Sequence, residues 1–472
     1  MAAHGFPGKF GGVPEALPQK AADKKKTTHR QKTGGSPLSL AGAAAEAIAP
    51  PNKIKENSVF LYPSAPNAAI MIRGNHTGKQ GAAKRMSDAI QTVLEQAVAQ
   101  EEIAGGALGV FREGQAPCWY KAGYADRAAK RPFEADTIVR LYSATKPITA
   151  AAAMLLMEQG RLDPGACLSE ILPEYAEQPV ARGGRLEPAA RPILIRDLLN
   201  MTSGLPYGGN PSSASSAAVG TLFEEMEKRL YTDSALTTRE VAARLAACPL
   251  DFQPGARWMY GTGADVLGAV IEQVSGCRFG AFLRKEFFEP LEMADTDFFV
   301  PPEKQGRLAK VYQKTKDGLA LYEGDNLAIR RGMDAAPAFE SGGAGLASTL
   351  TDYRHFAQML LDGGVWQGRR ILAPRTVAYL TAGRLLPWQQ TDFNQNWAAL
   401  SGYTYGNLMR VLEEPRQAAA LGTRGEYGWD GWLGFYFINS PADRLTMLLA
   451  IQQKDMGTAT LTRKLKNLVW LL

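Results

Sequence analysis

The sequence predicts an α/β fold with two lobes, in which both ends of a long folded region form one lobe and a mostly helical lobe is inserted between them. Short strand patterns occur in residues 105–141 and return in residues 405–452, whereas helical patterns dominate the stretch between them. Hydrophobic residues make up 45% and charged residues 21% of the 472, which is typical of a globular protein. We therefore expect an α/β lobe from about residues 86–142 and 345–472, and a helical lobe from about residues 143–344.

The first 85 residues form a basic extension. They contain 13 lysines and arginines against four acidic residues, whereas residues 86–472 contain 40 basic and 43 acidic residues. Proline, glycine, alanine and lysine are frequent and hydrophobic periodicity is weak, so residues 1–85 are predicted to be largely disordered. A targeting or anion-binding role competes with a simpler interpretation, in which the true start of the protein is Met86.

The predicted elements begin with residues 87–100, whose apolar side chains recur at helical spacing. Residues 105–126 contain two strand patterns joined by a glycine-containing turn, and residues 137–141 form a short extended run that leads to Ser143. The helices predicted for the inserted lobe include Pro147–Glu158, Leu194–Leu199, Thr238–Ala247, Asp265–Val274 and Phe279–Phe288. Beyond residue 350 we expect a helix at Asp352–Leu361, strands at Tyr405–Leu412, Leu433–Ile438 and Leu445–Gln452, and a final helix at Thr460–Leu472.

Two segments rich in small residues interrupt this pattern. Residues 208–220 are predicted to be a mobile loop that either shapes access to a site or is simple surface. Gly342–Gly345 is expected to line a cleft or to turn the chain back into the α/β lobe. Because sites in two-lobed molecules usually lie between the lobes, we look for functional residues near such segments.

Composition excludes several classes of protein. No run of eighteen apolar residues exists, so we expect no membrane span. No charged-then-apolar leader is visible, which favours a cytoplasmic location. No basic stripe with interleaved aromatic residues indicates a nucleic-acid partner. The four cysteines have no CxxC pair and are expected to be reduced and to bind no metal; they are Cys118, Cys167, Cys248 and Cys277.

Histidines offer little to a catalytic site. Three of the four, His4, His29 and His76, fall in the extension, and His355 lies in an amphipathic helical pattern that favours packing or surface exposure. No GxSxG sequence is present either. The sequence therefore offers no suitable histidine for a Ser-His-Asp triad, and a serine nucleophile would need another base.

Ser143-Ala144-Thr145-Lys146 offers such a base. A serine and a lysine three residues apart on a helix share one face, and burial can lower the lysine pKa until its neutral amine accepts the serine proton. A serine at a helix N-terminus also has free backbone N–H groups close by. Pro147 costs little in a first turn. The tetrapeptide alone is weak evidence, because one such match is expected by chance.

The surroundings of the tetrapeptide distinguish it from chance. Five ordered blocks resemble the serine β-lactamase and penicillin-binding-protein superfamily, in its class C-like branch of esterases, lactamases and D-stereospecific peptidases. The resemblance covers roughly residues 86–472. The blocks are TIVRLYSATKPITAAAAMLLMEQGRLDPG around Ser143, LIRDLLNMTSGLPY at 194–207, WMYGTGADVLGAVIEQVSG at 258–276, ESGGAGLASTLTDYRHFAQMLLDGG at 340–364 and YGWDGWLGFYFINSP at 427–441. The resemblance implies a β-lactamase/transpeptidase-like fold, an antiparallel sheet flanked by helices with a helical lobe beside it, and a mechanism that needs no metal or cofactor.

The resemblance also implies roles for individual residues. Tyr260 takes the place of the tyrosine in the family's YxN motif and would share protons with Lys146 as a coupled pair. Lys146 is the preferred base for acylation, although the two roles could be exchanged. The asparagine of that motif is replaced by Thr262, whose single hydroxyl cannot span two partners of a substrate amide.

The third family element, a KTG or HxG strand, is here Trp429-Asp430-Gly431. An aromatic first residue resembles the esterase members and would form an apolar wall for a neutral group; plain packing at a sheet edge is the alternative. Asp430 would add negative charge if it faces the cleft, and Gly431 permits close backbone approach. The resemblance implies that the Trp432 and Ser143 N–H groups form the oxyanion hole.

These residues favour a serine hydrolase that cleaves small carboxylic esters through an acyl-Ser143 intermediate. Hydrolysis of β-lactams or D-amino-acid peptides is the alternative within the same chemistry, and Trp429 argues against it because it cannot bind a substrate carboxylate as lysine does. An idle scaffold or self-assembling protein is the alternative from another class. The expected partner is a small ester or amide. The natural substrate and the oligomeric state are not specified by the sequence.

Overall fold

The computed structural model describes residues 76–472, with side chains from residue 84 onward. Most of the predicted extension therefore lies outside the described residues. The first helix, α1, spans His76–Ala99 and thus begins ten residues before Met86. The predicted boundary of the extension at residue 85 falls inside this helix, so the last residues of that segment are helical in the structure.

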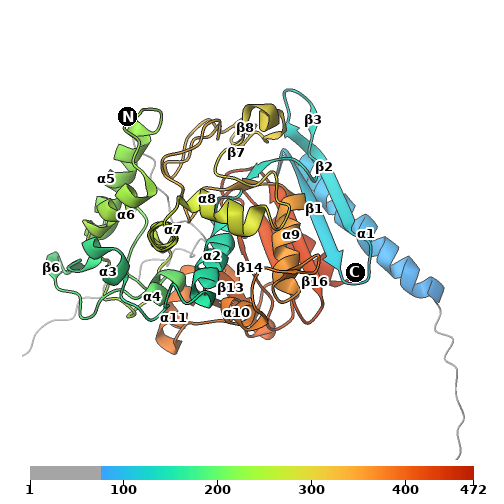
Figure 1. The fold of residues 1–472 in the computed structure, drawn as a ribbon. Coiled ribbons are helices and arrows are strands. Elements are labelled where there is room, and N and C mark those ends of the chain that lie inside the picture. Colours follow the sequence, from blue (N-terminus) through green and yellow to red (C-terminus); the bar gives the residue numbers. More distant parts are fainter. Residues whose placement is uncertain (1–75) are drawn as a thin grey trace, which may run out of the picture. The chain divides into compact units, whose positions relative to one another are not determined.

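An eight-stranded antiparallel sheet joins the two ends of the described chain (Figure 1). Strand β1 (Gly105–Arg112) pairs with β2 (Cys118–Asp126) on one side and with β16 (Leu445–Ile451) on the other. The strand order is β12-β13-β14-β15-β16-β1-β2-β3. The remaining strands are β3 Arg131–Pro132, β12 Tyr403–Gly406, β13 Met409–Leu412, β14 Tyr427–Asp430 and β15 Tyr436–Ser440. Both ends of the described chain thus contribute strands to one sheet.

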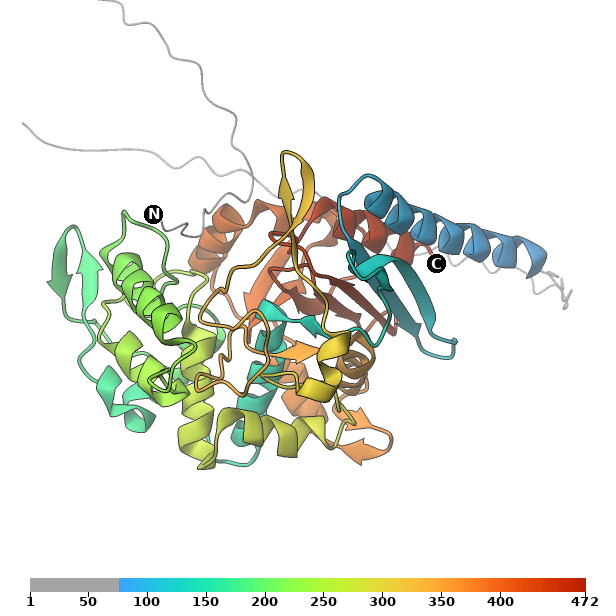
Figure 2. The ribbon, with the colours of Figure 1, turned by 90° about the horizontal axis from the view of Figure 1, so that it is seen from above.

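Two terminal helices cover one face of this sheet. Helix α1 and the last helix, α12 (Thr460–Trp470), lie beside each other against the sheet (Figure 2). Ile90 of α1, Leu465 of α12 and Leu108 of β1 are fully buried in one apolar cluster. Burial of these apolar side chains stabilises the packing of both helices on the sheet, by roughly 25 cal/mol for each Å² of apolar surface removed from water.

The opposite face of the sheet carries the helices that lead toward the second lobe. Helix α9 (Leu350–Leu361) packs on β15 and β16, and its Tyr353 ring lies 5.3 Å from the Phe437 ring in an edge contact. Helix α2 (Lys146–Glu158) lies between the sheet and the helical lobe, and its residues Ala150–Ala153 are completely buried. Because these side chains are small, α7 of the helical lobe can approach α2 closely.

The helical lobe is arranged around α7, whose first nine residues are buried. Helix α7 spans Gly263–Ser275, and the other helices of the lobe are α3 Leu168–Ile171, α4 Ile195–Leu199, α5 Ala214–Arg229, α6 Thr238–Ala246 and α8 Phe279–Leu283, which a π-turn at Arg284–Phe288 extends. Small hairpins lie outside the main sheet: β5 Val180–Arg182 with β6 Arg185–Glu187, β7 Tyr312–Thr315 with β8 Gly318–Leu321, and β10 Val365–Trp366 with β11 Arg369–Arg370. Helices α10 (Pro374–Leu380) and α11 (Pro387–Asn396) follow on the return to the sheet.

Two local predictions are wrong for identifiable reasons. Residues 214–220 are the start of α5 and not a mobile loop, because the Ser213 hydroxyl accepts a bond from the Ser216 N–H, 3.1 Å away, and caps the helix. The predicted strand over residues 405–412 is a hairpin. Asn407 and Leu408 have φ of 48° and 63°, the signs that a type I′ turn requires. The extended run predicted at residues 137–141 contains the short strand β4 (Val139–Arg140), which lies outside the main sheet and leads to Ser143 as expected.

Within the described part of the chain, no single helix has both the length and the apolar character of a membrane span. Among the described helices, only α7 taken together with the helical segment after it meets both criteria, and the two are bent by 74°. Most of α7 is buried in the protein core.

Candidate active site

Ser143 is presented by a short, tightly wound segment. Strand β4 (Val139–Arg140) pairs with β9 (Ala347–Ser348), and a 3-10 turn at Tyr142–Thr145 then leads into α2. Tyr142 has a φ of 45°, a left-handed conformation that costs energy for a large side chain. This turn leaves Ser143 half-buried at the start of the helix.

Lys146 is completely buried beside the serine. Its Nζ lies 3.3 Å from Ser143 Oγ, 3.3 Å from the Tyr207 hydroxyl and 2.8 Å from the Gly343 carbonyl oxygen. Burial lowers the pKa of Lys146 to about 7, and the charge of Asp265 opposes part of that shift. A substantial fraction of the amine is therefore neutral near pH 7 and can accept a proton.

Tyr260 lies on the other side of this lysine. Its ring centroid is 4.6 Å from Lys146 Nζ, and its hydroxyl accepts a hydrogen bond of 3.1 Å from the Trp429 Nε1–H. Burial raises the pKa of Tyr260 well above its usual value, and hydrogen bonds with Ser143 and Trp429 offset only part of the rise. The phenol is thus protonated at neutral pH and is a proton donor, not a phenolate.

Three groups that complete the surroundings of the lysine were assigned no chemical role from the sequence: Tyr207, Asp265 and Gly343. Asp265 Oδ1 accepts bonds from the Ser341 hydroxyl at 2.5 Å and from the Gly343 N–H at 3.0 Å. The Gly343 peptide therefore links Asp265 to Lys146. Tyr207 ends the block at 194–207 and Asp265 lies within the block at 258–276, but their contacts depend on the folded chain. Gly343 shows that the glycine segment lines the site, one of the two expectations for it.

Thr262 does not line the site as expected. It is completely buried, and its hydroxyl donates to the Pro206 carbonyl oxygen, 3.3 Å away. Gly261 packs so tightly that an added Cβ would lie 1.8 Å from the Leu205 carbonyl oxygen. Thr262 thus holds the backbone that precedes Tyr207, and its predicted role in substrate binding gains no support from these contacts.

Trp429 lies within the sheet and not at its edge, since β14 pairs with β13 and β15. Only 1% of the residue is exposed, so it cannot by itself form the broad apolar wall that was expected. Trp397, which the sequence did not single out, stacks on Trp429 at 5.0 Å and 22° and is half-buried. It also lies 5.0 Å from the Tyr260 ring. No local pattern around Trp397 indicates this long-range contact.

Asp430 does not contribute a free charge to a cleft. Its carboxylate forms an ion pair with the buried Arg410 and accepts a bond of 2.9 Å from the Thr458 hydroxyl. Because Arg410 neutralises this carboxylate within the sheet, the condition set for Asp430, a free charge that faces the cleft, is not met.

Gly431 permits the close approach that the sequence predicted. An added Cβ would lie 2.1 Å from the Leu141 carbonyl oxygen, so the end of β14 touches the segment before Ser143. The ring of Trp432 meets the ring of Tyr142 edge-on at 5.0 Å, and its indole N–H donates to Asp455 at 2.7 Å. These contacts bring the backbone of Trp432 beside the nucleophile turn.

Other candidate groups take part in ordinary packing. His355 Nδ1 lies 2.8 Å from the Leu291 carbonyl oxygen, and its ring packs 4.4 Å from the Trp366 ring. Among residues 84–472, no three or more His, Cys, Asp or Glu side chains gather as metal ligands would. The four cysteines form no disulfide.

Comparison with known proteins agrees with this geometry. A family model described as Beta-lactamase matches residues 90–468. The chain is 33% identical over 338 residues to Protein Rv1367c of Mycobacterium tuberculosis. This alignment covers 70% of this chain and 81% of that protein. It is 29% identical over 398 residues to esterase EstB of Burkholderia gladioli, covering 81% and 94% of the two chains.

The solved structure of EstCE1, a hydrolase with promiscuous acyltransferase activity, superimposes with a TM-score of 0.68. The two chains are 26% identical, and the superposition covers 82% of this chain and 99% of the other. The family match spans most of the sequence, and the antiparallel sheet flanked by helices is shared with these structures. This chain therefore belongs to the beta-lactamase family of serine hydrolases.

Proposed function

We propose that this protein hydrolyses small carboxylic esters through an acyl intermediate on Ser143. The observation that carries the proposal is the buried amine of Lys146, whose Nζ lies 3.3 Å from Ser143 Oγ and whose pKa is near 7. The similarity to esterase EstB supports an ester as the substrate, and the similarity to EstCE1, a hydrolase with acyltransferase activity, supports acyl transfer.

In the acylation step, neutral Lys146 accepts the proton of the Ser143 hydroxyl as Oγ attacks the ester carbonyl carbon. The carbonyl oxygen becomes an oxyanion, and the N–H groups of Ser143 and Trp432 are proposed to stabilise it. Preorganised donors of this kind commonly contribute about 10²–10³ in rate. The strained φ of 45° at Tyr142 and the tight packing of Gly431 support a fixed position for both donors.

Tyr260 then donates its proton to the leaving alcohol oxygen as the tetrahedral intermediate collapses, and the Lys146 ammonium passes the proton taken from Ser143 to the Tyr260 oxygen, which restores the neutral amine and the phenol of this pair. In deacylation a water molecule attacks the acyl carbon, loses a proton to this pair, and Ser143 Oγ leaves as the restored hydroxyl. The opposite pKa directions of the two groups favour Lys146 as the base and Tyr260 as the acid.

The aromatic surroundings favour a neutral acyl group. Trp429, Trp397 and Tyr260 stack around the nucleophile side of β14, and the carboxylate of Asp430 is already neutralised by Arg410. An apolar acyl chain gains by contact with such rings, whereas a charged substrate would lose solvation there.

A comparison of two chromogenic substrates tests this function. We expect faster turnover of p-nitrophenyl butyrate than of a chromogenic cephalosporin, and Ser143→Ala should abolish both. Ser212→Ala is a matched control, since Ser212 is exposed. An acyl mass shift on Ser143 should accompany ester turnover. Preference for the cephalosporin would favour the lactamase alternative, and the absence of both turnover and fluorophosphonate labelling would favour an idle scaffold.

A further inference from the structure

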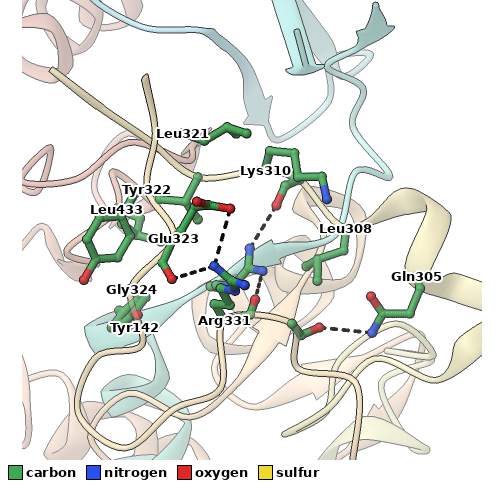
Figure 3. A pocket seen from close by; sticks show the side chains of 14 residues that line it. Tyr142, Gln305, Leu308, Lys310, Leu321, Tyr322, Glu323, Gly324, Arg331 and Leu433 are labelled. Atoms are coloured by element: carbon green, nitrogen blue, oxygen red, sulfur yellow. Dashed lines mark hydrogen bonds and ion pairs between the residues drawn. The ribbon is translucent and has the colours of Figure 1, made fainter. Parts of the chain in front are cut away.

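A cavity lies beside the nucleophile turn, at Tyr142. It has a volume of about 240 Å³, and Tyr142 and Leu433 form part of its wall (Figure 3). Among the described residues, its lining includes none of Ser143, Lys146 and Tyr260. The cavity is therefore separate from the catalytic groups, although Tyr142 directly precedes the nucleophile.

The lining of this cavity is cationic. Arg140, Lys310 and Arg331 contribute three positive charges, and Glu323 contributes one negative charge. The Glu323 carboxylate lies 3.6 Å from the Arg331 guanidinium and so compensates the positive charge of Arg331. Within residues 84–472, neither Arg140 nor Lys310 has a carboxylate within ion-pair distance. Two positive charges thus remain uncompensated around the cavity.

Arg140 is the unusual member of the set. Only 7% of the residue is exposed, and its Nη atoms donate to the carbonyl oxygens of Ala309, at 2.9 Å, and Arg331. Its Nε is buried and has no hydrogen-bond partner. A buried donor without a partner and a buried charge without a counter-ion both cost free energy.

Arg410, a fully buried arginine of the main sheet, shows how the charge of a buried arginine is compensated elsewhere in the protein. Arg410 is paired with Asp430, and its pKa is raised by neighbouring Tyr436 and Asp430 despite burial. Burial instead lowers the pKa of Arg140 to about 10, because no carboxylate lies nearby to offset it. The cavity beside Arg140 leaves room for the counter-charge that the protein does not supply.

We propose that this cavity binds a small anion, with a carboxylate or phosphate group held by Arg140 and Lys310. Such groups match the donor geometry of a guanidinium. Leu308, Leu321 and Leu433 give the remaining wall an apolar character, so the anion carries a short apolar part. The proposal is independent of the esterase function, because no catalytic group takes part in it.

Calorimetric titration of the full chain tests this site. The Ser143→Ala protein is titrated with inorganic phosphate, acetate or butyrate at constant ionic strength, so that no turnover contributes heat. We expect saturable binding of at least one of them at millimolar concentration. Tighter binding of phosphate would identify a phosphate ligand, and tighter binding of butyrate than of acetate would identify a carboxylate with an apolar part.

Two exposed lysines of the same segment provide a matched pair of variants. Lys310→Gln removes a lining charge and should weaken binding about fivefold, the effect of one partly exposed charge of about 1 kcal/mol. Lys314→Gln makes the same change of net charge outside the cavity and should weaken binding by less than about twofold. No saturable binding of any of the three anions, or equal effects of the two variants, would overturn the proposal.

Discussion

Lys146 Nζ lies 3.3 Å from Ser143 Oγ, and no part of the lysine side chain is exposed to solvent. Burial disfavours the ammonium form and so creates the base that the serine needs. The same burial costs stability whenever the lysine is charged. The link between Gly343 and Asp265 limits this cost, since the Gly343 carbonyl oxygen accepts the lysine N–H and the Asp265 carboxylate lies close enough to favour the charge.

Ester turnover should depend on the protonation of Lys146. Its pKa of about 7 means that the amine is protonated and inactive below neutral pH and neutral above it. We expect kcat/KM for p-nitrophenyl butyrate to rise about tenfold per pH unit below pH 7 and to level off above it. The pH profile of initial rates measures this, with circular dichroism to verify folding at each pH. A flat profile from pH 5.5 to 8 would contradict Lys146 as the base.

Stability should depend on pH through the same group. The pKa of Lys146 is about 7 in the folded state, below its ordinary value of 10.5, so between these values the unfolded chain binds more protons. Stability therefore rises with pH in this window. The free energy of unfolding of the wild type, relative to Lys146→Met, should increase by about 1–2 kcal/mol between pH 7 and 9. Urea unfolding at both pH values measures it; a constant difference would mean that Lys146 is charged throughout.

The hydrogen bond from Trp429 should influence kcat only by acting on the Tyr260 phenol. Tyr260→Phe removes the proposed acid and should lower kcat about 10²–10³-fold with little change in KM. Trp429→Phe keeps a ring but removes the donor, and should lower kcat about tenfold. In a double-mutant cycle, Trp429→Phe should have almost no further effect in the Tyr260→Phe background. Additive losses would show that Trp429 acts independently of Tyr260.

The sequence predicted the groups that lie close together along the chain or in a family motif. Ser143 and Lys146 share a helix face because of their spacing, and Tyr260 follows from its motif. The positions of Tyr207, Asp265 and Trp397 depend on the packing of separate segments, which no local pattern encodes. The orientation of Asp430 could not be predicted for a related reason. Its direction depends on the pairing of β13 with β14, which places Arg410 beside it.

The fold was predictable where burial patterns are strong. The hairpin of residues 105–126 and the helices around α7 have clear apolar periodicity. The turn at Asn407 and Leu408 was missed because it lacks the glycine that usually marks a type I′ turn. Helix α5 was missed because serine and alanine at its start resemble a linker, although Ser213 is an effective cap.

Trp397 should limit the length of the acyl group. It is half-buried and stacks on Trp429 and Tyr260, so Trp397→Ala would open space beside the catalytic phenol. We expect the ratio of kcat/KM for p-nitrophenyl octanoate to that for butyrate to rise about tenfold, as expected for a few methylenes in an apolar pocket. Trp388→Ala is the matched control, since Trp388 is 56% exposed. An equal change in both variants would place the acyl group elsewhere.

Asp430 should contribute to the stability of the fold and not to the binding of charged substrates. Asp430→Asn leaves the Arg410 guanidinium buried without a counter-ion, which should destabilise the fold by about 3–5 kcal/mol. Glu414→Gln breaks an exposed ion pair with Arg416 and should cost less than about 1 kcal/mol.

Chemical unfolding measures both losses. Adding Arg410→Met to Asp430→Asn removes the unpaired charge and should recover part of the stability, because a buried ion pair can be replaced by apolar groups at small cost. If Asp430→Asn instead leaves unfolding unchanged and alters only KM for charged substrates, its carboxylate faces the substrate. Full recovery of stability without recovery of kcat would show that the Arg410–Asp430 pair also positions the β14 backbone beside Ser143.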